Sequence, residues 1–216
     1  MNNKAVIFDM DGVLVDSEPI HEEAFELVFD EMGYGDNHGM DFASYYGRTD
    51  VELWRDFIDK HHPPQSFEEL LSWKQRRLID LLNERQPIFP EVITLLEKLK
   101  PHYKLAVASG SNHAVIGAVL SMRQLRSFFP VVVSVQDVPK GKPAPDVFLR
   151  TAELLHVHPK DCWVIEDSIA GIEASLAAQM RVIAIPNTLP KEKLSRATHV
   201  VSGYDQIESI INQNGN

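Results

Sequence analysis

Two kinds of hydrophobic periodicity divide the chain. Between about residues 17 and 85, apolar side chains recur every three or four positions, which is the spacing of amphipathic helices. Three helices are predicted there, over about 17–32, 50–59 and 66–82. From residue 90 onward, short runs rich in valine and isoleucine alternate with helical segments, a pattern typical of buried parallel strands joined by helices.

The alternating segments predict the fold class. Strands are expected at 5–8, 104–108, 131–135, 163–166, 182–185 and 199–201, and helices at 92–100, 113–120, 145–155 and 169–179. Because right-handed crossovers place helices on both faces of such a sheet, we expect an α/β fold with a doubly wound, parallel, Rossmann-like sheet. Residues 1–16 and 86–216 would form this core, and residues 17–85 an inserted α-helical cap domain. The tail from 212 to 216 is expected to fray.

Composition and charge exclude several kinds of partner. The 216-residue chain has a net charge of −10, which argues against nucleic acid or an anionic membrane as partner. No apolar run approaches transmembrane length and the start, MNNK, does not resemble a signal peptide, so we expect a cytoplasmic protein and, by default, a monomer. The single cysteine, Cys162, has apolar neighbours and is expected to be a core thiol. A zinc site with His156 and His158 is a weaker hypothesis, because no fourth ligand is in view.

The end of the first predicted strand carries an acidic pair, Asp9 and Asp11, followed by Gly12. Side chains two apart in an extended chain point the same way, so both carboxylates would leave the strand end together. Two close carboxylates repel unless a cation lies between them or one keeps its proton. A turn could explain one aspartate but explains the pair less well. A calcium-binding loop is excluded because apolar residues occupy its later ligand positions.

Polar residues also follow two later strands of the predicted sheet. The strand at 104–108 is followed by Ser109, Gly110 and Ser111, where a hydroxyl and backbone N–H groups could bind an anion. An ordinary turn between strand and helix is the more common explanation of such a sequence. Lys142 in KGKPAPD precedes a proline, which keeps the backbone extended and could aim the ammonium as a point charge. A solvated surface lysine is the alternative. The glycine-rich lead of a P-loop is absent.

Glu166 and Asp167 end the strand at 163–166. An acidic pair that continues a buried strand is unfavourable unless a cation compensates it. Because the carboxyl ends of parallel strands meet at one edge of a sheet, the pair can join Asp9 around a magnesium ion, which prefers oxygen ligands.

These residues together resemble the four motifs of the haloacid dehalogenase superfamily in order and type. The stretch AVIFDMDGVLVDS, the motif KPAPD, the motif EDS followed by Gly171, and the helical insertion are similar to the β-phosphoglucomutase subgroup. The resemblance implies that Asp9 attacks phosphorus to form an aspartyl phosphate, and that Asp11 protonates the leaving oxygen and later activates water. It also implies that Ser109 and Lys142 are catalytic residues, which position the phosphoryl group and neutralise its charge. Asp9, Asp11, Glu166 and Asp167 would hold Mg²⁺.

Residues of the predicted cap bear on the substrate. His21 and Lys74 lie on otherwise apolar helix faces, and the resemblance implies that they position the general acid; an interface histidine and a lysine that extends to solvent are equally good explanations. The loop Gly47, Arg48 and Thr49 is similar to the cap specificity loop of sugar-phosphate phosphatases.

Two positions depart from the mutase pattern. Asp50 stands where the mutase has an arginine, and Asn112 follows Ser111 where the mutase has a lysine. Gly110, Ser111 and Asn112 are kept as candidate substrate-binding residues. We therefore expect a Mg²⁺-dependent phosphatase of a small phosphorylated metabolite, with a phosphosugar mutase as the alternative and a non-catalytic binding protein as an alternative of another class.

Overall fold

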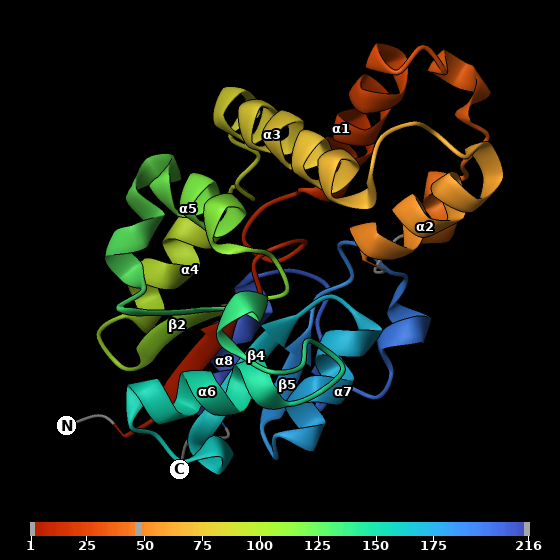
Figure 1. Ribbon diagram of the computed structural model, residues 1–216. Coiled ribbons are helices and arrows are strands. Elements are labelled where there is room, and N and C mark those ends of the chain that lie inside the picture. The colour runs from red at the N-terminus through yellow and green to blue at the C-terminus, as the bar shows by residue number, and fades with distance from the viewer. Residues whose placement is uncertain (1–2, 46–48, 214–216) are drawn as a thin grey trace.

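A six-stranded sheet in the order β3-β2-β1-β4-β5-β6 forms the centre of the molecule (Figure 1). The computed structural model describes residues 3–45 and 49–213. All five strand pairs are parallel, as expected. The predicted strands are confirmed, with ends that shift by at most one residue: β1 (Ala5–Phe8), β2 (Lys104–Ser109), β3 (Val131–Ser134), β4 (Cys162–Glu166), β5 (Arg181–Ala184) and β6 (His199–Val200).

Helices cover both faces of the sheet, which confirms the doubly wound α/β class. Val6 and Phe8 of β1 pack in one core cluster with α4, α5 and α8, whereas Ala5 and Ile7 pack in a second cluster with α6 and α7. Alternate residues of the strand thus face opposite layers, and for this reason its sequence is apolar throughout. The helices are α4 (Val92–Leu99), α5 (His113–Ser121), α6 (Asp146–Leu155), α7 (Ile169–Ala177) and α8 (Asp205–Gln213).

The C-terminal helix α8 is not among the predicted elements, and the expectation that the tail frays from residue 212 is wrong for Asn212 and Gln213, which are helical. Ile207 and Ile211 lie one helical turn apart and are buried against the sheet. Their burial holds α8 against the sheet.

Three of the four α-helices between β1 and β2 form a separate layer, seen above the sheet in Figure 1. They are α1 (Glu18–Glu31), α2 (Asp50–His61) and α3 (Phe67–Arg85). Capping boxes at Thr49 and Ser66 begin α2 and α3. The three helices share an aromatic core around Phe29, Trp54 and Phe57, which is distinct from the two clusters of the sheet. We call residues 17–85 the helical unit.

Two adjacent chain segments connect the helical unit to the sheet. The backbone N–H of Asp16 donates to Pro87 O at 2.8 Å, and Val15 forms an antiparallel bridge with Ile88. The chain therefore enters and leaves the helical unit side by side. Short 3-10 helices complete the structure: η1 (Gly35–His38), η2 (Phe42–Tyr45), η3 (Met122–Phe128), η4 (Val135–Asp137), η5 (Pro159–Asp161) and η6 (Lys191–Leu194).

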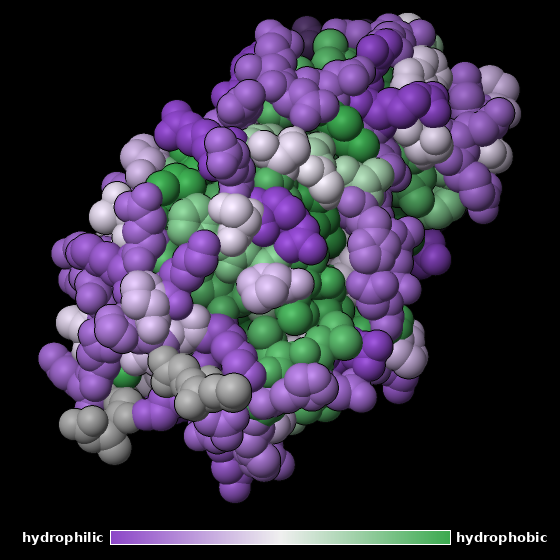
Figure 2. Space-filling view, turned by 90° about the vertical axis from the view of Figure 1, so that its left-hand side faces the viewer, coloured by the Kyte–Doolittle hydropathy of each residue, from purple (hydrophilic) through white to green (hydrophobic). Residues whose placement is uncertain are grey.

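The surface differs between the two parts of the molecule. Figure 2 shows polar side chains over the helical unit and a group of apolar side chains lower on the same face. Within the described residues, no helix combines the length and the apolar character needed to cross a bilayer.

Candidate active site

Asp9 lies directly after β1 and contacts a lysine from a distant loop. Lys142 Nζ donates to Asp9 Oδ1 and to Glu166 Oε1, each at 2.6 Å. Burial raises the pKa of Asp9 to about 7 even though the Lys142 ammonium opposes this shift. Burial alone would lower the pKa of Lys142, but the two carboxylates raise it overall, so the ammonium stays charged. The structure thus brings together three residues that are far apart in sequence.

Three buried carboxylates form a possible metal site. Ligand oxygens of Asp9, Glu166 and Asp167 all lie within 4.8 Å of one another. One carboxylate oxygen of Glu166 is already engaged, because Oε2 accepts hydrogen bonds from Asp167 N, Ser168 N and Ser168 Oγ at 2.9–3.0 Å. Burial and the neighbouring carboxylates also raise the pKa of Asp167. A divalent cation fits here. When all three carboxylates are ionised, the single Lys142 ammonium does not balance their charge, and a divalent cation would neutralise the excess.

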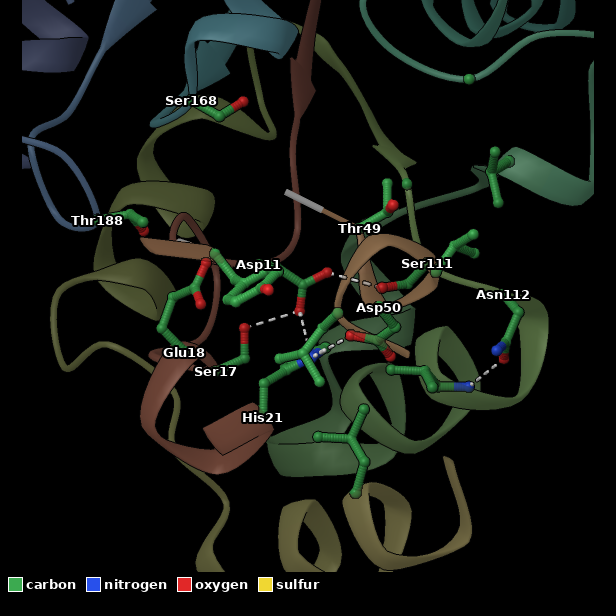
Figure 3. Close-up of a pocket in the computed structure, with 18 of the residues that line it drawn as sticks. Asp11, Ser17, Glu18, His21, Thr49, Asp50, Ser111, Asn112, Ser168 and Thr188 are labelled. Atoms are coloured by element: carbon green, nitrogen blue, oxygen red, sulfur yellow. Dashed lines mark hydrogen bonds and ion pairs between the residues drawn. The ribbon is translucent and has the colours of Figure 1, made fainter. Parts of the chain in front are cut away.

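The side chain of Asp11 is not one of the three carboxylates of this cluster, so its expected place among the metal ligands stays a prediction. Asp11 Oδ1 accepts from Ser17 Oγ at 2.7 Å and Oδ2 accepts from Ser111 Oγ at 2.8 Å (Figure 3). β1 ends at Phe8, yet the side chains of Asp9 and Asp11 both line the same cavity, as the alternation argument predicts. At Gly12, with φ +70°, an added Cβ would lie 1.8 Å from an Asp167 oxygen, so this turn requires glycine.

Of the residues predicted to bind an anion in the turn after β2, only some line the cavity. Ser109 is fully buried, and its hydroxyl accepts the backbone N–H of Ser111 at 2.9 Å. Because β2 extends through Ser109, this side chain does not line the cavity, whereas Gly110, Ser111 and Asn112 do. Ser111 thus lines the cavity, and the role expected of Ser109 stays a prediction. Asn112 caps α5 and also accepts from Gln75 of α3 at 3.4 Å, which joins the helical unit to the sheet.

A polar network in the helical unit faces Asp11. Lys74 Nζ lies 2.7 Å from His21 Nδ1 and 2.7 Å from Asp50 Oδ2. An ammonium can only donate, so His21 Nδ1 accepts and its Nε2 carries the hydrogen. That Nε2 lies 3.9 Å from Asp11 Oδ1 and, among the described residues, has no hydrogen-bond partner. Lys74 is fully buried, so it does not extend to solvent as one alternative supposed.

A cavity of about 500 Å³ lies between the helical unit and the sheet. Asp9, Asp11, Lys142 and Asp167 line its sheet side, and His21, Thr49 and Asp50 are among the residues that line its other side. Gly47 and Arg48 lie outside the described residues.

The sequence analysis missed three polar residues at the site. The Ser17 hydroxyl bonds Asp11 and does not cap α1. Asp50 was considered only as a departure from the mutase pattern, and it pairs with Lys74. Thr188, which follows β5, donates a hydrogen bond from Oγ1 to Asp167. Its position beyond a parallel strand is the signal that could have found it.

The structure gives no support to the zinc hypothesis. Cys162 is buried, its Sγ contacts the backbone oxygen of His158, and burial raises its pKa to about 12. Among the residues that the structure describes, the acidic cluster is the only set of three or more metal-ligating groups.

Comparison with known proteins defines the class of this chain. Residues 6–185 match the haloacid dehalogenase-like hydrolase model, so the chain belongs to this family and the expected resemblance is confirmed. It is 36% identical over 186 residues to hexitol phosphatase B of Escherichia coli strain K12, covering 84% of this chain and 83% of the relative. It is 30% identical over 183 residues to an E. coli fructose-1-phosphate phosphatase, covering 83% of this chain and 95% of the relative.

A solved structure is also similar. The β-phosphoglucomutase of Clostridium difficile has a TM-score of 0.79 at 27% identity, with 97% of this chain and 96% of that chain covered. These matches confirm the expected enzyme class, a phosphomonoester hydrolase of the haloacid dehalogenase type.

Proposed function

We propose that this protein is a Mg²⁺-dependent phosphatase of small phosphorylated metabolites, with sugar phosphates as its substrates. Residues 17–85 would act as a cap domain over a core of residues 1–16 and 86–216. The observation that carries the proposal is Asp9 at a buried strand end, 2.6 Å from the Lys142 ammonium and beside the carboxylate of Asp167. The similarity to phosphatases of hexitol phosphates and fructose 1-phosphate supports the substrate class.

Asp9 would act as the nucleophile. One of its carboxylate oxygens forms a bond to phosphorus while the bond to the leaving alcohol oxygen breaks, and Asp11 gives that oxygen its proton. The Asp11 carboxylate then accepts a proton from water, whose oxygen attacks phosphorus and releases phosphate and free Asp9. Lys142 and the backbone N–H groups after β2 bind the phosphate oxygens.

Other residues of the site orient these groups. Asp9 and Asp167 would hold Mg²⁺, which supplies charge neutralisation when bound. Glu166 holds Lys142, and Ser17 and Ser111 hold Asp11. The His21 N–H, oriented by Lys74, faces Asp11 and can stabilise its carboxylate once the proton has been given away. Thr49, Gly110 and Asn112 lie where they can contact the substrate, and Gly47 and Arg48 remain candidates from the sequence alone.

The test is turnover of p-nitrophenyl phosphate with Mg²⁺, with EDTA, and in the variant Asp9→Asn. EDTA is expected to abolish turnover, and Asp9→Asn to lower it by at least about 10³-fold. Asp16→Asn is the matched control, since Asp16 is exposed and does not line the cavity. Label from ³²P-substrate should remain on acid-quenched protein and be released by hydroxylamine. Metal-independent turnover, or turnover that survives Asp9→Asn, would contradict the proposal.

A phosphosugar mutase is the second candidate, because a solved mutase shares the fold at 27% identity. The assay uses β-glucose 1-phosphate with a trace of the 1,6-bisphosphate. Release of inorganic phosphate is expected. Formation of glucose 6-phosphate would identify a mutase.

A further inference from the structure

The loop after β5 contacts one of the three carboxylates of the acidic cluster. Thr188 belongs to this loop and lines the cavity (Figure 3). Its Oγ1 donates a hydrogen bond to Oδ2 of Asp167, which follows the neighbouring strand β4. The loop after β1 reaches the same place, because a Cβ added at Gly12 would lie 1.8 Å from Asp167 Oδ2 and 2.6 Å from Thr188 Oγ1. Three loops therefore meet at one carboxylate oxygen.

Hydrogen bonds hold the loop after β5 against the loop after β1. Asn187 Nδ2 donates to Gly12 O at 2.8 Å and to the Tyr204 hydroxyl at 2.9 Å. That hydroxyl in turn donates to Val13 O at 2.7 Å. Because Asn187 is bonded at two points, the backbone of the next residue, Thr188, is held close to the site.

Asp167 differs from the other two carboxylates in the charge of its hydrogen-bond partner. Lys142 Nζ donates to Asp9 and to Glu166, each at 2.6 Å, whereas Asp167 accepts from the neutral hydroxyl of Thr188. An ammonium orients a carboxylate and also neutralises its charge. A hydroxyl orients the carboxylate and leaves its full charge to a cation. Since Thr188 engages Oδ2, the other oxygen, Oδ1, is left to bind such a cation.

We propose that Thr188 is a positioning residue, whose hydroxyl orients the Asp167 carboxylate so that Oδ1 is available to the divalent cation. This inference rests on the proposed function, and it adds a residue that sets how tightly the cation binds. Polar groups that orient a metal ligand raise the affinity for the metal, and their removal typically lowers that affinity by about 10–100-fold. Loss of the Thr188 hydroxyl should therefore weaken Mg²⁺ binding.

Two substitutions at Thr188 separate the hydroxyl from the shape of the side chain. Thr188→Val removes the hydroxyl and keeps the branched shape, whereas Thr188→Ser keeps the hydroxyl. Calorimetric titration with MgCl₂ alone measures the Kd for Mg²⁺ without substrate. We expect Thr188→Val to raise this Kd by about 10–100-fold and Thr188→Ser to remain within about 3-fold of wild type. Thr94→Val is the matched control, because Thr94 is exposed on α4 and does not line the cavity.

Further measurements distinguish positioning from a merely structural role. In EDTA, the loss of one hydrogen bond in Thr188→Val should lower the unfolding temperature by at most about 4 °C. The rise in unfolding temperature on addition of Mg²⁺ should be smaller in Thr188→Val than in wild type, because the stabilisation by a ligand depends on its Kd. In turnover, the Mg²⁺ concentration for half-maximal rate should increase by the same factor as the Kd. At saturating Mg²⁺, kcat should return to within about 3-fold of wild type.

The outcomes separate this inference from the proposed function. A Thr188→Val variant that binds Mg²⁺ as tightly as Thr94→Val would overturn the inference and leave the phosphatase intact. So would a Thr188→Ser variant that binds Mg²⁺ as weakly as Thr188→Val, since the hydroxyl would then not be the group that matters. A wild-type protein that binds Mg²⁺ but hydrolyses no phosphate ester would contradict the proposed function, and the Kd comparison would still test Thr188. A wild-type protein that binds no Mg²⁺ would overturn both.

Discussion

The substitution Gly171→Ala adds one methyl group and tests the hydrogen bonds that hold the Glu166 carboxylate. An added Cβ at Gly171 would lie 1.7 Å from Glu166 Oε1, 1.9 Å from Cδ and 2.3 Å from Oε2. These distances are far below van der Waals contact, so the Gly171→Ala variant must displace the whole carboxylate. Glu166 is fully buried.

The magnitude follows from the hydrogen bonds of that carboxylate. It accepts from Lys142 Nζ, Asp167 N, Ser168 N and Ser168 Oγ. Hydrogen bonds to a charged group contribute about 1.5–3 kcal/mol each, so the loss of two lowers the free energy of unfolding by about 3–6 kcal/mol. Alanine in a helix recovers at most about 1 kcal/mol. We expect a net destabilisation of about 2–5 kcal/mol.

Gly117→Ala is the matched control, because Gly117 is also helical and an added Cβ meets nothing within 4 Å. This variant is expected to be more stable than wild type by about 0.5–1 kcal/mol. Urea unfolding followed by far-UV circular dichroism measures both values. Turnover of Gly171→Ala should also fall about 10–100-fold because Lys142 loses one of its two anchors. Equal stability of the two variants would refute the role assigned to Glu166.

Three further predictions address other parts of the molecule. In EDTA, the free energy of unfolding should fall by up to about 4 kcal/mol between pH 4 and pH 7 because of Asp9. Its pKa is raised from 3.8 to about 7 in the folded state, so the stability that the protonated carboxyl contributes is lost as it ionises. Thermal unfolding across this range measures the change, and a pH profile of Asp9→Asn as steep as that of wild type would contradict the assignment. Cys162 should react with a thiol-directed disulfide reagent at least about 100-fold more slowly in the folded protein than in urea, because it is buried and its pKa is about 12; equal rates would refute its burial. Tyr204→Phe should lower the free energy of unfolding by about 1–2 kcal/mol in urea, because the hydroxyl donates to Val13 O at 2.7 Å and accepts from Asn187 at 2.9 Å; a neutral result would show that these bonds do not hold the loop after β1.

The sheet was predictable because burial on both faces leaves a strong sequence signal. Continuous apolar runs such as Val6 to Phe8 can only be central parallel strands once helical patterns lie between them. Asp9, Lys142 and Glu166 followed from the same topology, because the carboxyl ends of parallel strands meet at one edge.

The direction of individual side chains was not predictable in the same way. Ser109 and Ser111 differ in sequence only by their place around a turn, and the exact end of β2 decides which one faces the cavity. Side-chain alternation places Asp11 on the same side as Asp9, but it cannot indicate the hydrogen bonds that Ser17 and Ser111 donate to Asp11. Asp50 belongs to the site through Lys74, a contact between two helices that local periodicity cannot reveal.

The paired connections at Val15 and Ile88 have an evolutionary consequence. Because the chain passes between sheet and helices at one place only, the helical segment can be replaced, lengthened or resequenced while the strand order and the loops that bear the reacting carboxylates stay unchanged. Under the proposed function, discrimination among alcohols and cleavage of the phosphate ester would be encoded in separable stretches of the gene, and selection could alter the first without having to rebuild the second.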